Sequence, residues 1–315
     1  MAILVTGGAS FIGSYVVRRL LARNERVVAF DLVPTPNAAD EILTAAERER
    51  ISMIQGDVTD LGALLHAIRT HGIETVVHLA GLLIPACQAD PASAVRVNCS
   101  GLVNVLEAAR LLGLRRVVWS SSVAVFGPPE RYAELPLGDD APHFPTTVYG
   151  ATKSFGERLL EHYHHAFGVE SVGLRFTAVY GLGRQRGASA FIMDLLEAPA
   201  RGRPCTILYG DDALDWQYVE DAAAAVLLAC DAPGAAGHTY NVPGEYRSLR
   251  QAADCVRGLL PGSDITLTPG RTGMVWRFDA TGAATDLGYR PRFALEQGFR
   301  ETINAIRSRS GLPSV

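Results

Sequence analysis

The chain has 315 residues, which is long enough for one large α/β domain with a smaller appended lobe and a substantial buried core. Its formal net charge of −4 and its scattered basic residues exclude the cationic patch that binds nucleic acid or an anionic membrane, so we expect a small-molecule partner. Five cysteines without CxxC or Cys/His spacing, the lack of an apolar run of membrane-spanning length, and an amino terminus that leads straight into a strand predict a soluble, cytoplasmic protein without a metal site.

The first half of the chain alternates short apolar runs with amphipathic stretches, which is typical of βαβ units and a parallel sheet covered on both faces. Strands are predicted at residues 3–6, 27–30, 52–54, 75–79, 116–120 and 171–175, and helices at 12–23, 61–71, 92–112 and 149–167. The proline-rich stretch 128–145 is predicted to be a surface loop. We therefore expect a doubly wound parallel sheet of the Rossmann type over residues 1–180. A smaller, mainly substrate-binding lobe over 181–315 is expected to be interleaved with the last sheet elements.

A glycine-rich turn follows the first predicted strand. The strand ends at Thr6, and the segment from Gly7 to Gly13 then opens an amphipathic helix. This context is typical of a dinucleotide-binding turn, in which the pyrophosphate lies on the helix amino terminus. An ordinary tight turn is the alternative interpretation. The predicted cofactor-binding residues of this segment are Gly7, Ser10, Phe11, Ile12 and Gly13.

Further candidate cofactor contacts follow the next three strands. Asp31 lies about twenty residues past the glycines, where a carboxylate accepts hydrogen bonds from a ribose 2′-hydroxyl and repels a 2′-phosphate. NAD is therefore the expected cofactor. Asp57 is placed to bind an adenine amino group, with a turn aspartate as the alternative, and His78 is interpreted as a core histidine. The remaining predicted contacts in these segments are Leu32, Val58, Leu79, Ala80 and Gly81.

The strongest chemical signal is the pair Tyr149 and Lys153, because i to i+4 spacing on a helix places phenol and ammonium on one face. Lys153 is the only lysine in the sequence, in which arginine serves elsewhere as the cation. The lysine charge is expected to lower the pKa of the phenol, so that it acts as a base. Three serines at 120–122 end the fifth strand, where one hydroxyl is expected to hold the reacting oxygen; the alternative is that they only satisfy loop backbone groups.

Together these segments resemble the extended short-chain dehydrogenase/reductase family, in its NAD-dependent sugar epimerase/dehydratase branch. The resemblance implies that Ser122 joins Tyr149 and Lys153 as a catalytic residue. It also implies that the helix containing Asn98 supports the cofactor site and that Thr177 contacts the nicotinamide. The substrate-binding residues implied by the resemblance are Ser122, Tyr149, Ala178, Arg184 and Arg271.

Three positions depart from the family pattern. Ser10 replaces the second glycine of the turn, which bears on cofactor affinity. Ala178 stands where nucleotide-sugar epimerases usually have Asn, and Leu214 stands where they usually have an Arg that binds substrate phosphate. Arg184 and Arg271 are expected to hold a diphosphate instead.

We expect an NAD-dependent oxidoreductase that acts on a sugar hydroxyl, nominally a nucleotide-sugar epimerase that oxidises its substrate transiently. The alternatives are an NAD-dependent dehydrogenase of a smaller polyhydroxy substrate, such as a free sugar or sugar acid, and a noncatalytic NAD-binding protein. The predicted helices 92–112 and 149–167 look too apolar around their faces for one side to be solvated, and family members commonly pair these helices. A homodimer is therefore expected.

Overall fold

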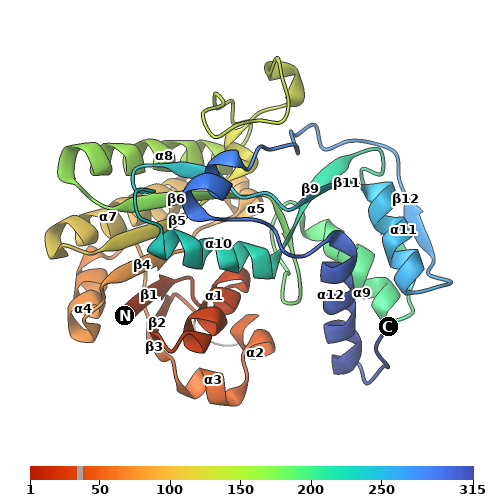
Figure 1. Cartoon of the computed structure of the whole chain (residues 1–315), viewed down its shortest axis with the longest axis horizontal. Helices are drawn as coiled ribbons and strands as arrows, with labels where there is room; N and C mark the ends of the chain where they lie inside the picture. Colours follow the sequence, from red (N-terminus) through yellow and green to blue (C-terminus); the bar gives the residue numbers. More distant parts are fainter. Residues whose placement is uncertain (34–37) are drawn as a thin grey trace.

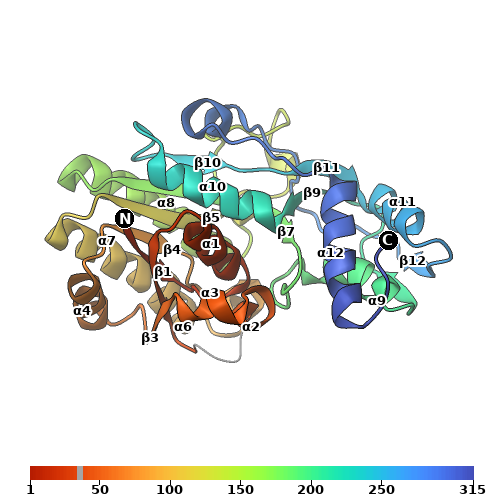
Figure 2. The same cartoon turned by 60° about the horizontal axis from the view of Figure 1, so that its bottom comes forward.

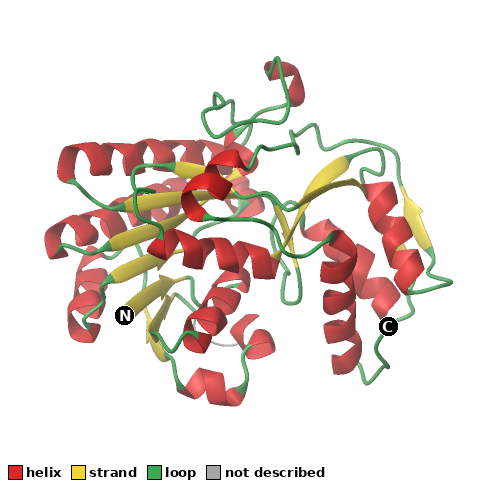
Figure 3. Ribbon diagram, viewed as in Figure 1, coloured by secondary structure: helices red, strands yellow, loops and turns green. Residues whose placement is uncertain are grey.

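A seven-stranded sheet forms the centre of the computed structural model, which describes residues 1–33 and 38–315 (Figure 1; Figure 3). All of its neighbouring strands pair in parallel, in the order β10-β6-β5-β4-β1-β2-β3. The predicted doubly wound parallel sheet is confirmed. The strands are β1 (Ala2–Thr6), β2 (Arg26–Asp31), β3 (Ser52–Gln55), β4 (Thr75–His78), β5 (Arg116–Ser122), β6 (Ser171–Phe176) and β10 (Thr239–Asn241).

Helices cover both faces of this sheet, and each face has its own apolar core. On one face α1 (Phe11–Ala22) packs against α10 (Val219–Asp231), although about two hundred residues separate them in the chain (Figure 2). On the other face lie α4 (Leu61–His71), α7 (Gly101–Leu112) and α8 (Val148–Phe167). Both α10 and β10 belong to the large layer although they follow residue 180, so the second half of the chain completes the sheet.

The predicted continuous helix 92–112 is wrong in one respect. The structure has α6 (Pro91–Ala94), a π-helical stretch η1 (Val95–Ser100) and then α7. A π-turn adds a residue to the helical repeat and often marks a functional site. Asn98 lies in η1, where its Oδ1 accepts a hydrogen bond from Leu82 N at 2.8 Å and its Nδ2 donates to Leu82 O at 3.0 Å. The altered turn thereby anchors the loop that follows β4.

The smaller lobe contains a three-stranded sheet, β11-β9-β7, and a two-stranded sheet, β12-β8. Tyr180, Trp216 and Phe299 pack edge to face at its centre, with ring centroids 5.2 to 6.2 Å apart. Its elements are β7 (Ala178–Tyr180), η4 (Ala190–Met193), α9 (Asp194–Ala200), β8 (Cys205–Ile207), β9 (Ala213–Tyr218), β11 (Glu245–Ser248), α11 (Leu249–Leu259), β12 (Ile265–Leu267) and α12 (Leu295–Arg309).

Short elements connect these layers. They are α2 (Ala38–Ile42), α3 (Ala45–Glu49), α5 (Ile84–Ala89), η2 (Val123–Val125), η3 (Pro129–Arg131) and η5 (Ala283–Leu287). The loop predicted at 128–145 is present but is tied down at Leu137, which is buried, donates its amide to Arg277 O and accepts from Asp279 N. In the described ranges no helix is both long and apolar enough to cross a membrane.

Candidate active site

The carboxyl end of β5 lies against the first two turns of α8, where Tyr149 and Lys153 lie. Thr147 caps this helix by accepting a hydrogen bond from Gly150 N at 3.0 Å. A Cβ atom on Gly150 would lie 2.1 Å from Ala124 O, so only glycine lets the start of α8 approach the segment after β5 this closely. The approach places Tyr149 beside Ser122, whose hydroxyl acts to lower the pKa of the phenol.

Lys153 lies beneath the tyrosine in a nearly closed environment. Its side chain donates from Nζ to Ser120 O at 2.5 Å, and the residue is only 4% exposed. The ammonium lies 5.6 Å from the centre of the Tyr149 ring and 4.7 Å from that of Trp119. Burial lowers the pKa of Lys153 to about 8. The predicted pairing of Tyr149, Lys153 and Ser122 therefore appears in the structure as one cluster.

The predicted effect of Lys153 on the phenol is corrected by the structure. Burial raises the pKa of Tyr149 to about 12, while the hydrogen bond with Ser122 and the nearby charge of Arg184 act in the lowering direction. Lys153 Nζ lies 5.6 Å from the centre of the Tyr149 ring and donates its hydrogen bond to Ser120 O. Lys153 is therefore not among the groups that shift the pKa of Tyr149 in this structure.

The glycine turn leaves no room for side chains at its three glycines, Gly7, Gly8 and Gly13. Gly7 has a φ of +69°, and a Cβ atom there would lie 2.8 Å from Ala80 N, while one on Gly13 would lie 2.1 Å from Gly7 O. Ser10 caps α1 by accepting from Gly13 N at 3.3 Å. The first amides of a helix, here including those of Phe11 and Ile12, have no intrahelical carbonyl to bind. The turn therefore fits a pyrophosphate, and Ser10 fits without backbone strain at its φ of −75°.

Asp31 lies against this turn at the end of β2. Its Oδ2 accepts a hydrogen bond from Ala9 N at 3.1 Å, and its Oδ1 accepts one from Val33 N at 3.4 Å. Leu32 beside it is 59% exposed. Asp57 is exposed and closes a turn by accepting from Thr59 N at 2.9 Å, while Val58 is buried. The structure thus brings Asp31 to the glycine turn, where a dinucleotide ribose would be held.

We expect the protein to bind NAD more tightly than NADP, because a 2′-phosphate would meet the Asp31 carboxylate. A charge-assisted hydrogen bond is worth about ten- to hundredfold in affinity, and Asp31→Ser should remove most of the preference. Isothermal titration of both dinucleotides into both proteins measures it. Asp57→Asn is the control, since it should leave the NAD to NADP ratio unchanged; equal binding by the wild-type protein would contradict the role of Asp31.

The loop after β4 forms the wall beside Lys153. Leu79 N donates to Thr6 O at 3.0 Å and Ala80 N to Thr6 Oγ1 at 3.4 Å, which ties the loop to the end of β1. A Cβ atom on Gly81 would lie 4.0 Å from Lys153 Nζ. His78 Nδ1 lies 2.6 Å from Thr6 Oγ1, and burial, with the nearby Lys153 charge, lowers the pKa of His78 to about 3. His78 is thus a neutral core residue.

Two of the predicted contacts, Thr177 and Ala178, are engaged with other parts of the protein. The hydroxyl of Thr177 donates to Asp215 Oδ1 at 2.6 Å, inside the smaller lobe. Ala178 is completely buried in β7, so its methyl group offers no surface to a substrate in this structure. Leu214 is also completely buried, in β9.

The two arginines predicted on the substrate side differ in their surroundings. Arg184 lies in the turn after β7, where it donates to Val179 O and, at 2.8 Å, to Ser189 Oγ. Burial lowers the pKa of Arg184 to about 10, so it remains charged at neutral pH. Arg271 is exposed on the loop after β12, and its side chain makes no hydrogen bond or ion pair within the described ranges. The structure places the charge of Arg184 near Tyr149.

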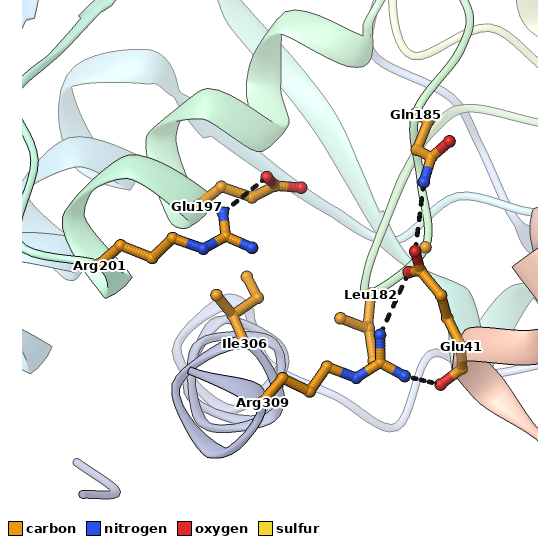
Figure 4. A pocket seen from close by; sticks show the side chains of 8 residues that line it. Glu41, Leu182, Gln185, Glu197, Arg201, Ile306 and Arg309 are labelled. Atoms are coloured by element: carbon orange, nitrogen blue, oxygen red, sulfur yellow. Dashed lines mark hydrogen bonds and ion pairs between the residues drawn. The ribbon is translucent and has the colours of Figure 1, made fainter. Parts of the chain in front are cut away.

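A cleft between α2 and α12 lies next to the turn that carries Arg184 (Figure 4). Arg309 of α12 forms an ion pair with Glu41 at 3.3 Å, and Gln185 donates to the same carboxylate at 3.4 Å. Arg201 on the other wall pairs with Glu197 at 3.0 Å. Because these charges are paired within the protein, the cleft is better described as a contact between the two lobes than as a ligand site.

A buried charge cluster behind the catalytic residues was not predicted from the sequence. Glu157 of α8 accepts from Ser121 Oγ at 2.5 Å and from Arg175 at 2.9 and 2.6 Å, and lies 3.3 Å from His143 Nε2. The cluster joins α8, β5, β6 and the loop 128–145. Glu157 lies one helical turn beyond Lys153, and this spacing is the feature of the sequence from which the position of Glu157 behind the site could have been predicted.

Comparisons with known proteins agree with this geometry. The model of the NAD dependent epimerase/dehydratase family matches residues 3–243. A UDP-glucose 4-epimerase of Mycolicibacterium smegmatis is 32% identical over 98% of this chain and 100% of its own. The structure of a Thermus thermophilus UDP-glucose 4-epimerase in complex with NAD is similar, with a TM-score of 0.81 at 28% identity over 98% of this chain and 99% of that one. An L-threonine dehydrogenase from Cupriavidus necator has a TM-score of 0.85 at 28% identity over 98% and 100%.

Proposed function

Because the chain belongs to the NAD-dependent epimerase/dehydratase family, we propose that it is a nucleotide-sugar 4-epimerase. Its cofactor is NAD, as in the family. The observation that carries the proposal is the cluster of Tyr149, Ser122 and Lys153, which the close approach at Gly150 assembles beside the dinucleotide turn. This set suits the oxidation of a secondary alcohol.

The residues of the cluster have distinct tasks. In its ionised form Tyr149 accepts the proton of the substrate hydroxyl on Oη, and Ser122 Oγ donates a hydrogen bond to the reacting oxygen. Bound NAD supplies the acceptor and afterwards the donor of the hydride. Lys153 holds the cofactor ribose and keeps a positive charge below the phenol. In an epimerase Tyr149 then returns the proton after the ketone has been reduced on its other face.

The second candidate function is that of an NAD-dependent dehydrogenase of a smaller polyhydroxy substrate, which would release the ketone and NADH. This function is favoured by Leu214, because its side chain offers no charge to a diphosphate. A noncatalytic NAD-binding protein is disfavoured by the assembled cluster.

One assay separates these functions. The protein is incubated with NAD and one compound at a time: UDP-glucose, UDP-galactose, UDP-glucuronate, or the corresponding free sugars and sugar acids. NADH formation is followed by absorbance at 340 nm, and NMR detects a new epimer. An epimer without net NADH supports the proposal, net NADH from a free sugar or acid supports the second candidate, and neither product with any compound contradicts both.

Lys153→Arg is expected to lower kcat/KM by at least about a hundredfold, because a guanidinium is larger than an ammonium and the site is nearly closed. The change keeps the charge and therefore tests shape. Arg158→Lys is the matched control on the exposed side of α8, with a side chain 75% exposed. Steady-state kinetics compare both variants. Near wild-type rates for Lys153→Arg would contradict a role of Lys153 in the active site.

We also propose a homodimer in which η1, α7 and α8 of two copies pack together. A groove on these helices is lined by Val95, Cys99, Val103 and Phe155, and Val95 and Phe155 are 52% and 49% exposed. Such an exposed apolar groove is typical of an interface. A two-fold axis places the same groove on both partners.

Phe155→Glu is expected to convert the dimer to a monomer, because it would bury two carboxylates at the shared interface. Sedimentation equilibrium at micromolar concentration measures the mass. Tyr246→Glu serves as the control, since Tyr246 is 46% exposed on β11 of the smaller lobe. A wild-type protein that is only monomeric would contradict the proposed dimer.

A further inference from the structure

Thr152 connects the backbone of Tyr149 to the loop after β4. The residue is only 5% exposed, and its hydroxyl donates to Tyr149 O at 2.7 Å and accepts from Asn98 Nδ2 at 3.1 Å. Asn98 in turn binds both backbone groups of Leu82, its N–H at 2.8 Å and its carbonyl at 3.0 Å. A continuous chain of hydrogen bonds therefore runs from the loop after β4 to the peptide group that follows Tyr149.

The peptide group that precedes Tyr149 is held by the same part of the chain. The first amides of a helix have no intrahelical carbonyl to bind, and that of Val148 donates to Gln88 Oε1 at 2.7 Å. Gln88 belongs to α5, which follows the predicted cofactor contacts at 79–81. The segment 79–98 thus holds both peptide groups that flank Tyr149.

A purely structural role of Thr152 is the competing explanation, because threonine hydroxyls on helices commonly bind the carbonyl three or four residues before them. Thr302 of α12 shows this habit: it is 1% exposed, and its hydroxyl donates to Gly298 O at 2.8 Å. In the part of the chain that the structure describes, the Thr302 hydroxyl makes no second hydrogen bond. The bond from Asn98, a residue of another helix, is what distinguishes Thr152.

We propose that Thr152 is a positioning residue, which fixes Tyr149 relative to the bound cofactor by tying its peptide group to the loop that lines the cofactor site. This inference rests on the proposed function, in which Tyr149 exchanges a proton with the substrate. A small displacement of a reacting group slows the chemical step far more than it weakens binding. The contribution of Thr152 is therefore expected in kcat and not in KM.

The surroundings of Asn98 make a selective variant possible. Its Nδ2 carries two hydrogens but has three acceptors within 3.5 Å: Thr152 Oγ1, Leu82 O and Cys87 Sγ. Thr152→Val keeps the shape of the side chain and removes the hydroxyl, and Asn98 then still has one acceptor for each hydrogen. The loop after β4 should keep its place, so NAD should bind as before.

Three further variants complete the set. Thr152→Ser restores the hydroxyl without the methyl group, and Thr152→Ala removes the hydroxyl in a smaller side chain, so the test does not depend on valine being accommodated. Thr302→Val removes an equally buried hydroxyl with the same kind of helical bond, far from Tyr149 in the chain. Melting temperatures of all variants report the stability cost of each change.

The kinetic test uses UDP-galactose as substrate and a titration of NAD. Thr152→Val and Thr152→Ala should lower kcat by about ten- to hundredfold, with KM and the NAD dissociation constant within about threefold of the wild-type values. Thr152→Ser should recover most of the lost rate. Thr302→Val should keep the wild-type kcat even where its melting temperature falls as far as that of Thr152→Val.

A second measurement requires no turnover. In NAD-bound protein labelled with ¹³C-tyrosine, the ring resonance of Tyr149 is the one that Tyr149→Phe removes. Thr152→Val should shift this resonance, whereas Thr152→Ser and Thr302→Val should leave it in place. Absence of turnover with UDP-galactose would contradict the proposed function, and the resonance would then decide the role of Thr152.

Four results would overturn the assignment of Thr152. They are an unshifted Tyr149 resonance in Thr152→Val, a wild-type kcat in that variant, an equal loss of kcat in Thr302→Val, and a Thr152→Ser protein as slow as Thr152→Val. A fall in kcat that is matched by the NAD affinity would also overturn it, because the hydroxyl would then be needed for the cofactor site as a whole.

Discussion

Replacing Tyr149 with phenylalanine is expected to lower kcat by about 10²- to 10⁴-fold, which is the usual contribution of a positioned acid or base. The phenol oxygen lies beside Ser122 and is the group that we propose exchanges a proton with a substrate hydroxyl. Phenylalanine keeps the ring that lies over Lys153 Nζ, so NAD should still bind with nearly the wild-type dissociation constant. Steady-state kinetics and an NAD titration on the same preparation measure the two effects.

The control lies on the same helix. Tyr163→Phe also removes one hydroxyl group, but Tyr163 donates to Glu107 at 2.7 Å on the far part of α8. We expect this variant to keep nearly the wild-type kcat. A Tyr149→Phe enzyme with a comparable rate would show that another group exchanges the proton.

Glu157→Gln is expected to lower the free energy of unfolding by about 3 to 5 kcal/mol, because it leaves the guanidinium of Arg175 buried and unpaired. The two side chains are only 6% and 4% exposed and are joined at 2.6 Å. Ser121 would also lose its carboxylate acceptor. Urea denaturation followed by circular dichroism measures the change.

The matched substitution is Glu161→Gln, one turn further along α8, where the carboxylate pairs with Arg158 and is 47% exposed. Glu161→Gln should lower the free energy of unfolding by less than about 1 kcal/mol, since exposed ion pairs contribute little to stability. Equal losses for the two variants would contradict the role of the buried cluster.

The acid sensitivity of this pair follows from the same carboxylate. Burial alone would raise the pKa of Glu157, but hydrogen bonds from His143 and Arg175 and their charges bring it down to about 2. A folded-state pKa below the ordinary value of 4.5 means that the stabilisation is fully present above that pH and is lost as the pH falls toward 2.

The regular part of the fold was predictable because the parallel strands are continuous buried apolar runs. The predicted strands lie within two residues of β1 to β6, and the glycine turn correctly marked the start of α1. Residues 95–100 keep a helical pattern of side chains, so periodicity alone did not reveal that their hydrogen bonds follow a π-helix. Nor did local pattern reveal β10, which pairs with β6 after an intervening lobe.

The catalytic cluster was predictable for a different reason. Tyr149 and Lys153 share one helix, so their spacing determines their proximity, and Lys153 is the only lysine of the sequence. The sign of the pKa shift of Tyr149 depends on burial by other segments, which no local pattern contains. The direction of the Thr177 hydroxyl likewise depends on Asp215, a residue of another strand.

The order of strands has a consequence for how the molecule comes apart. The chain leaves the large sheet after β6, builds β7, β8 and β9 of the smaller lobe, returns as α10 and β10, and leaves again for β11 to α12. Cutting the chain between the lobes would strip the large sheet of its edge strand and of the helix that covers α1. We therefore expect that neither lobe folds on its own, and that unfolding of one lobe exposes the apolar core of the other. A ligand that binds either lobe is then expected to protect the whole polypeptide against denaturation and proteolysis.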